Sequence, residues 1–255
     1  MPKTQVNKPY RWLAQYYDEL FSSFRSPLDL VRGRVLSGIL PRVKTACDLA
    51  CGTGTTALTL AGKGINTYAV DLSPLMCRLA REKATSARLS LHVLRADMRS
   101  FRLSEPMDLI ICEYDALNHV PHKADLRRVA RAVARALRPG GYFYFDVNNS
   151  RGFQRYFSGT IWVEKPGVAA VMRNGHNGQC DRAWIEIEWF IREGRSWRRR
   201  HERVEEVCWS SGEIRKTLQN AGFDSLRAWD AAPFRKNSRV GPGYRTIYLA
   251  RKSKG

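Results

Sequence analysis

Short apolar runs alternate with amphipathic segments through the first half of the chain. The apolar runs have the length and composition of buried strands, and they occupy residues 43–50, 65–70, 89–95, 107–112 and 142–147. The segments 53–61 and 123–137 have the apolar spacing of helices. Because strands that alternate with helices form a parallel sheet covered on both faces, this half of the chain predicts an α/β fold.

The pattern changes between residues 148 and 210. Segments of strand character now follow one another with glycine or asparagine turns between them, at residues 160–163, 168–172, 183–192 and 197–207. Within residues 184–191, apolar side chains alternate with acidic ones. That alternation is typical of an antiparallel sheet with one face in water.

The last part of the chain returns to mixed helix and strand character. Residues 210–221 predict a helix, which Ser210 or Ser211 would cap and Gly222 would end. Two further strand patterns, at 223–230 and 244–250, would complete a main sheet of seven strands.

These elements divide the chain into a lead-in, a core and an insertion. Residues 1–40 form the helical lead-in, in which the apolar face carries Tyr10, Leu13, Tyr17 and Leu20. We expect residues 41–148 and 210–255 to form one core, with residues 149–209 as an antiparallel sheet inserted after the fifth strand. Since the insertion starts where that strand ends, it would lie over a site at the strand ends.

The segment 48–54, Asp-Leu-Ala-Cys-Gly-Thr-Gly, lies where the first strand turns into the first helix of the core. Glycines at such a turn let the chain bend sharply and let a ligand approach the backbone. Asp71 ends the next strand, where a carboxylate can accept both hydroxyls of a ribose. The pattern therefore predicts a site for a nucleoside cofactor.

Two cofactors fit this turn. Residues 52–57 satisfy the loose dinucleotide pattern G-x-G-x-x-G/A, with Asp71 as the ribose acid of an NAD enzyme. Asp48 at the end of the first strand instead suits a cationic amine, which S-adenosylmethionine carries and a dinucleotide diphosphate lacks. Asp97 and Met98 end the third strand, and a carboxylate beside a thioether suits an adenine.

Four motifs in this order and spacing resemble those of the class I S-adenosylmethionine-dependent methyltransferases. They are DLACGTG at 48–54, VDLS at 70–73, ADM at 96–98 and LRPGGYFYFDV at 137–147. The resemblance implies a Rossmann-like, mostly parallel sheet and the cofactor S-adenosylmethionine, with S-adenosylhomocysteine as product. It also implies in-line transfer of a methyl group to N or O of a small-molecule acceptor.

The resemblance also implies roles for individual residues. Cofactor contacts are implied for Tyr10, Tyr17, Asp48, Ala50, Gly52, Gly54, Asp71, Leu72, Asp97, Met98 and Glu113. Gly52 and Gly54 would hold the methionine part, with Asp48 near its amine. Asp71 would bind the ribose hydroxyls, and Asp97 the adenine amine.

The resemblance also implies roles for Leu72, Met98, Tyr10 and Tyr17. Leu72 would pack on the adenine, and Met98 would offer its backbone nitrogen. Tyr10 and Tyr17 are seven residues apart on one helical face, so either hydroxyl could meet the methionine carboxylate. Packing in the core is the alternative for both tyrosines.

The acceptor decides whether the chemistry needs a base, because an amine attacks through its lone pair whereas a hydroxyl must lose a proton. His119, in the segment after the fourth strand, is the candidate base or acceptor-positioning group. His201, on an insertion strand, is the second candidate. A structural role for His119 and a surface role for His201 are the alternatives. We expect no metal site.

The aromatic residues of the insertion could line the acceptor pocket or form the insertion's own core. They are Phe153, Tyr156, Phe157, Trp162, Trp184 and Trp189. Neither the acceptor nor the choice between monomer and homodimer follows from the sequence.

The chain of 255 residues has 43 lysines and arginines against 24 acidic residues, a formal charge of +19. Such a charge attracts anions, so it fits an anionic acceptor, nucleic acid or only an arginine-rich proteome.

Base-methylating enzymes often carry N/D-P-P-Y/F after the fourth strand. Residues 113–116 read Glu-Tyr-Asp-Ala there, which argues against amino methylation of adenine or cytosine. Methylation of RNA or another polyanion remains the second hypothesis. An NAD-binding oxidoreductase and a cofactor-binding protein without turnover are further alternatives.

The remaining features favour a cytoplasmic protein. No apolar run has the length of a membrane span, and the first residues lack the apolar core of a signal peptide. The six cysteines form no C-x-x-C pair and lie mostly in apolar patterns. This arrangement is typical of reduced, buried thiols rather than of disulfides or zinc ligands.

Overall fold

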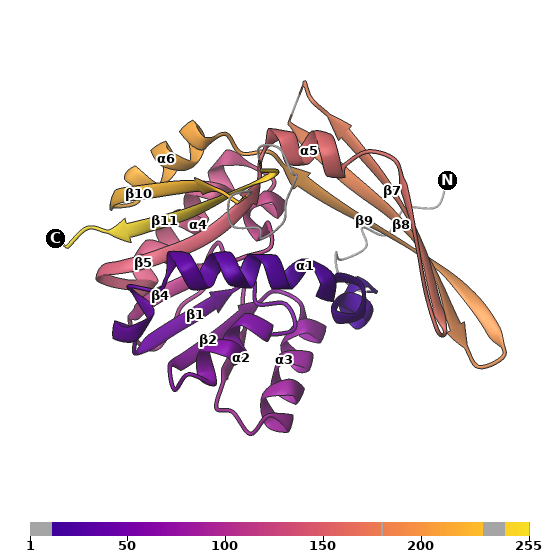
Figure 1. The fold of residues 1–255 in the computed structure, drawn as a ribbon, viewed down its shortest axis with the longest axis horizontal. Coiled ribbons are helices and arrows are strands. Elements are labelled where there is room, and N and C mark those ends of the chain that lie inside the picture. The colour runs from indigo at the N-terminus through magenta and orange to yellow at the C-terminus, as the bar shows by residue number, and fades with distance from the viewer. Residues whose placement is uncertain (1–11, 180, 232–242, 255) are drawn as a thin grey trace.

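The computed structural model describes residues 12–179, 181–231 and 243–254 and contains two sheets (Figure 1). The main sheet has the strand order β10-β11-β5-β4-β1-β2-β3. Its strands are β1 (Thr45–Leu49), β2 (Asn66–Asp71), β3 (His92–Arg95), β4 (Met107–Cys112), β5 (Leu137–Asn148), β10 (Phe223–Asp230) and β11 (Arg245–Lys252). The α/β fold predicted from the sequence is confirmed.

The first five strands of the main sheet are parallel, and β11 runs antiparallel to its neighbours β5 and β10. All residues of β4 are buried. A strand covered on both faces has no polar side to show, which explains why residues 107–112 read as one continuous apolar run.

Helices cover both faces of this sheet (Figure 1). They are α1 (Leu13–Val35), α2 (Thr55–Ala61), α3 (Pro74–Ser86), α4 (Lys123–Ala136) and α6 (Ser211–Gln219). The helix α5 (Ser150–Tyr156) lies beside the insertion instead, and η1 (Leu40–Arg42) and η2 (Ala116–His119) are short 3-10 helices. One core cluster joins α1 and α2 to the sheet through Leu28, Val31 and Leu60. The other joins α4 and α6 to it through Val133 and Ile214.

The insertion forms a separate antiparallel sheet in the order β6-β7-β8-β9, as predicted. Its strands are β6 (Thr160–Lys165), β7 (Val168–Asn177), β8 (Arg182–Glu193) and β9 (Ser196–Val207). Ile187 and Trp189 lie on the buried face, which packs against Tyr16 and Tyr17 of α1.

Of the insertion aromatics, Phe153, Phe157 and Trp189 are buried in the insertion's own clusters, whereas Trp162 is 58% exposed. The three buried rings therefore serve as structural core, the alternative that the sequence left open.

The predicted cap and stop of the last helix are confirmed. Ser210 caps α6 in a capping box with Glu213, and Gly222 follows with φ 90°. The fifth strand begins before the predicted residue 142, because residues 138–141 form an irregularity within β5. A Cβ on Gly141 would lie 3.0 Å from the carbonyl oxygen of Arg138 and 3.1 Å from that of Met107, so this backbone approach depends on glycine.

Within the described part of the chain, none of the helices has both the length and the apolar composition that crossing a bilayer requires. The cysteines that are described, Cys47, Cys51, Cys77, Cys112 and Cys208, are free thiols.

Candidate active site

The turn between β1 and α2 has the open backbone that the sequence predicts. Ala50, Gly52 and Gly54 have φ angles of 58°, 54° and 81°. A Cβ on Gly54 would lie 2.9 Å from the Cβ of Ala80 on α3, whereas one on Gly52 would have no atom within 4 Å. Gly54 is therefore needed for packing, and the space over Gly52 is open to a ligand.

Asp71 at the end of β2 is tied to this turn. One carboxylate oxygen accepts a hydrogen bond from the Gly52 N–H at 2.9 Å, and the other accepts from the Ser73 N–H at 2.8 Å. Burial raises the pKa of the Asp71 carboxyl. Leu72 beside it is 59% exposed. The strand end thus presents a fixed carboxylate next to an exposed apolar side chain.

Asp48 and Glu113 lie beneath the turn, 3% and 5% exposed. Asp48 accepts a hydrogen bond from the Ala57 N–H at 2.9 Å, and burial together with the nearby Glu113 raises its pKa to about 8. Glu113 is bound by the guanidinium of Arg32 and by the Thr56 hydroxyl at 2.9 Å. Burial raises the pKa of Glu113 to about 7.

Asp97, after β3, is engaged by its neighbour Arg99. The Arg99 guanidinium donates to both carboxylate oxygens at 2.5–3.0 Å, and the Arg99 N–H donates at 2.8 Å. The side-chain hydrogen bond from Arg99 lowers the pKa of Asp97, so its carboxylate is ionised. Met98 between them is partly buried. The sequence motif did not indicate that Arg99 would hold Asp97.

The lead-in helix reaches the glycine turn through Asp18, which no sequence motif indicates. Asp18 of α1 pairs with Lys83 of α3 and accepts a hydrogen bond from the Thr53 hydroxyl at 2.7 Å. Tyr17 is partly buried against the insertion core. Tyr10 lies outside the described residues.

The backbone after β4 is held in an unusual conformation. Tyr114 and Asp115 have φ angles of 59° and 54°. Both N–H groups donate to the buried carboxylate of Asp146 on β5, at 2.7 and 3.2 Å. Arg245 of β11 pairs with Asp146 and lies 2.6 Å from the Asp115 carboxylate. Left-handed conformations of side-chain-bearing residues are characteristic of functional sites, where the surroundings hold them.

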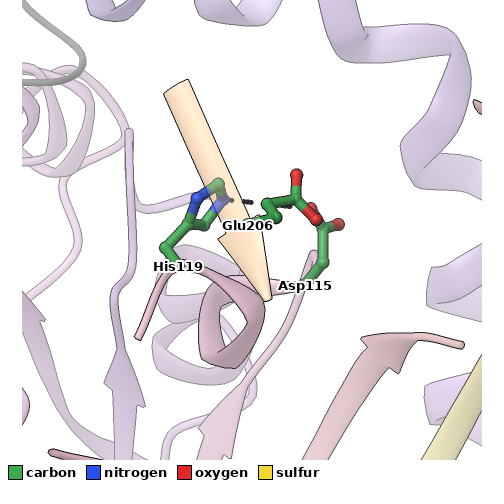
Figure 2. A group of neighbouring side chains, drawn as sticks. All are labelled: Asp115, His119 and Glu206. Carbon is green, nitrogen blue, oxygen red and sulfur yellow. Dashed lines mark ion pairs between the residues drawn. The ribbon is translucent and has the colours of Figure 1, made fainter. Parts of the chain in front are cut away.

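Asp115, His119 and Glu206 come together from the loop after β4, η2 and β9 (Figure 2). Their possible ligand atoms lie within 4.8 Å of one another. His119 Nδ1 lies 3.2 Å from the carbonyl oxygen of Glu205. Because a carbonyl only accepts, Nδ1 carries the proton and Nε2 the lone pair. Burial lowers the pKa of His119, so the ring is neutral at neutral pH.

Figure 2 shows the carboxyl groups of Glu206 and Asp115 next to each other, with the His119 ring facing them. The His119 Nε2 lies 3.9 Å from the Asp115 carboxylate. Burial, the charge of Asp115 and the hydrogen bond between the two carboxyl groups raise the pKa of Glu206 well above its usual range, so Glu206 carries a proton and donates it to Asp115. The side-chain amide of Asn148 donates to Glu206 at 3.2 Å.

Glu206 was missed in the sequence, although its position held a signal. It lies two residues after the buried Val204, and therefore on the buried face of β9. An acid on that face has to find a partner or a function. The three residues could also ligate a metal ion, but the guanidinium of Arg245 against Asp115 opposes a second cation there.

His201, the second candidate from the sequence, lies elsewhere. It pairs in register with Glu188 of β8, on the face of the insertion sheet opposite to Trp189. Its ring nitrogens lie 3.0 and 3.3 Å from the carboxylates of Glu186 and Glu188. The structure does not bring His201 to the cluster around His119.

Comparisons with known proteins agree with this geometry. Residues 46–141, which contain the glycine turn and the strand ends, match the family described as "Methyltransferase domain". The protein YqeM of Bacillus subtilis (strain 168) is 28% identical over 247 residues, covering 96% of this chain and 98% of YqeM. A sugar methylase of Saccharopolyspora spinosa, dTDP-4-amino-2,3,4,6-tetradeoxy-D-glucose N,N-dimethyltransferase, is 30% identical over 131 residues, about half of each chain.

A solved structure has a similar fold over nearly the whole length. It is an S-adenosylmethionine-dependent methyltransferase from Clostridium acetobutylicum ATCC 824, with a TM-score of 0.78 and 26% sequence identity. The similarity covers 96% of this chain and 99% of that one. Together with the matched domain and the glycine turn, it identifies the chain as an S-adenosylmethionine-dependent methyltransferase with the class I, Rossmann-like fold.

Proposed function

We propose that this enzyme methylates nitrogen or oxygen of a small-molecule acceptor, and that the acceptor binds at Asp115, His119 and Glu206. The observation that supports this proposal most is the position of the cluster. It follows β4 at the edge of the sheet where β1 and β2 end in the glycine turn and Asp71. Ligands of open α/β sheets bind at this edge.

The chain's own residues fit the cofactor. The open space over Gly52 admits the methionine part, the fixed carboxylate of Asp71 suits the ribose hydroxyls, and the exposed Leu72 suits the adenine face. When bound, the cofactor supplies a methyl group on a sulfonium. The protein then has to align the acceptor and exclude water. Asp48 would face the amine of the methionine part. The Asp97 carboxylate, which already accepts from Arg99, would also accept a hydrogen bond from the adenine amine.

Proton transfer falls to His119 in this proposal. A neutral imidazole with its lone pair on Nε2 can take the proton that the acceptor N–H or O–H loses. The carboxylate of Asp115 lies 3.9 Å from Nε2 and would stabilise the imidazolium that forms. Arg245 and the hydrogen bond with the protonated Glu206 hold Asp115 in place.

Nitrogen is the favoured acceptor atom. The Asp115 carboxylate can accept a hydrogen bond from an acceptor N–H, which leaves the nitrogen lone pair free to attack. The similarity to a sugar N,N-dimethyltransferase over half of the chain supports the same acceptor class. The two remaining cofactor assignments, Tyr10 and Tyr17, stay predictions.

Calorimetry with S-adenosylmethionine and S-adenosylhomocysteine tests the cofactor site. We expect Asp71→Ala to weaken both ligands about tenfold or more, since it removes a charged partner of the ribose. Asp224→Ala, an exposed position on β10, is the matched control. Unchanged binding in Asp71→Ala would overturn the assignment.

An acceptor panel tests the acceptor class. It should contain amino sugars linked to nucleoside diphosphates, simple amines and phenols, and the transfer of a labelled methyl group should be greatest for the amines. A panel in which only an RNA accepts the methyl group, with steeply salt-dependent binding, would overturn the small-molecule proposal.

A further inference from the structure

A cavity of about 590 Å³ lies away from the cofactor turn. The residues at the C-terminal end of α1 form one wall, and β5, β10 and β11 form the others. Its volume falls within the range of small-molecule sites. Tyr142 of this cavity lies near the start of β5, about 20 Å along the strand from Asn148 beside the active-site cluster.

Three arginines line the cavity, Arg34, Arg227 and Arg251. The described residues that line it include no carboxylate, and none of the three forms an ion pair with a residue that the structure describes. Uncompensated like charges repel one another, and a concave wall of one sign concentrates the field. The chemistry of the cavity therefore favours an anion.

Two of the guanidinium groups are held against aromatic rings. Arg227 lies 4.9 Å from the centre of the Trp229 ring, and Arg251 lies 5.7 Å from that of Tyr142. Stacking fixes the plane of a guanidinium while its N–H edge can still bind a phosphate with two hydrogen bonds. The Nε of Arg251 also donates to the Gly140 carbonyl at 3.3 Å. These contacts pre-arrange the donors.

Aromatic and apolar side chains complete the lining of the cavity. They are Tyr142, Trp229 and Leu249, beside the arginines. We propose that this cavity binds a nucleotide, whose phosphate meets the arginines and whose base packs against these aromatic and apolar side chains. The nucleotide is either free or part of single-stranded RNA, since both present the same phosphate and base. The site is separate from the methyl-transfer site. It would assign a ligand to three of the basic residues that contribute to the formal charge of +19.

The experiment measures binding of UTP and of a short oligouridylate to the full chain by calorimetry at low salt. Saturating S-adenosylhomocysteine occupies the cofactor site, and uridine avoids the adenine subsite. We expect binding in the wild type. Arg227→Gln and Arg251→Gln should each weaken it about tenfold, because each removes a charge-assisted bond to phosphate.

Arg127→Gln is the matched control, an exposed arginine of α4 on the other face of the sheet. It should leave binding unchanged. Equal affinity for UTP and the oligonucleotide identifies a free nucleotide, and binding of the oligonucleotide alone identifies RNA. Absence of binding of both, or equal loss in Arg127→Gln, would overturn the proposal. Affinity for S-adenosylmethionine in the same variants should be unchanged, which separates this site from the active site.

Discussion

Arg32 of α1 and Glu113 at the end of β4 form a buried ion pair, with side chains 8% and 3% exposed. The Arg32 guanidinium also lies 3.2 Å from the Thr56 hydroxyl of α2, which bonds Glu113 in turn. The pair therefore joins the covering helix α1 to the strand end that precedes the candidate acceptor loop.

Removing one partner of this pair should be costly. Arg32→Met leaves the Glu113 carboxylate buried without its cation, and we expect it to lower the free energy of unfolding by about 3–5 kcal/mol in a urea titration. The double variant Arg32→Met, Glu113→Leu should recover part of this loss, because no charge is then left buried. Arg78→Met, from the exposed pair with Glu82, is the control and should cost less than about 1 kcal/mol. A double variant less stable than Arg32→Met alone would contradict this account.

Binding of the cofactor should release a proton near pH 7. Asp48 has a pKa of about 8 in the ligand-free protein, so it is mostly protonated there. The cationic cofactor stabilises its carboxylate and lowers that pKa, so affinity should rise with pH from about 6 to 8, by up to about tenfold per pH unit.

Calorimetry at pH 7 in buffers of different ionisation enthalpy measures the number of protons released when the cofactor binds. In Asp48→Asn, whose side-chain oxygen can still accept from the Ala57 N–H, the proton release should disappear. Equal proton release in Asp48→Asn and the wild type would assign the proton to another group.

The two glycines of the turn should respond differently to alanine. Gly54→Ala forces a Cβ into a left-handed conformation and against Ala80, and should lower stability by about 2–4 kcal/mol. Gly52→Ala meets no protein atom, so it should cost only about 1 kcal/mol but weaken cofactor binding at least tenfold by filling the open space. Thermal unfolding and cofactor calorimetry measure the two effects.

Gly212→Ala is the control for both glycines. Gly212 lies in α6 without a left-handed φ and with no atom near an added Cβ, so alanine should stabilise the helix by about 0.5–1 kcal/mol. Full cofactor affinity in Gly52→Ala would show that the ligand does not approach that backbone.

The sequence predicts the parts of this molecule that depend on neighbours along the chain. The strand of residues 107–112 is recognisable because burial on both faces requires an apolar run, and α6 because its cap and its stop are local. The glycine turn is recognisable because its conformation restricts the residue type.

Contacts between distant residues are not predictable in this way. Asp18 meets Lys83 and Thr53 only because α1 folds back over the turn, and no local pattern in residues 13–35 indicates it. Glu206 reaches His119 because Asn118 of η2 bonds the backbone of Val207 at 2.8 Å and that of Asn148 at 3.2 Å. These long-range hydrogen bonds determine which insertion residue enters the candidate site. No pattern in a single sequence indicates which of these distant residues will pair.

The role of His119 can be separated from that of a structural histidine. In His119→Asn the side-chain amide can still donate to the Glu205 carbonyl, so the fold should be kept while the lone pair of Nε2 is lost. We expect kcat to fall about a hundredfold with little change in cofactor affinity. The wild-type rate should fall at acidic pH with an apparent pKa below 6.5, because burial disfavours the charged ring and the protonated form cannot accept a proton. This acidic limb should be absent from the variant.

His201→Asn is the control, because His201 lies on the face of the insertion sheet opposite to Trp189 and away from His119. It should keep both the rate and the pH profile. If His119→Asn matched the wild type in both, the proton would leave the acceptor by another route, and Asp115 would be the group to test next.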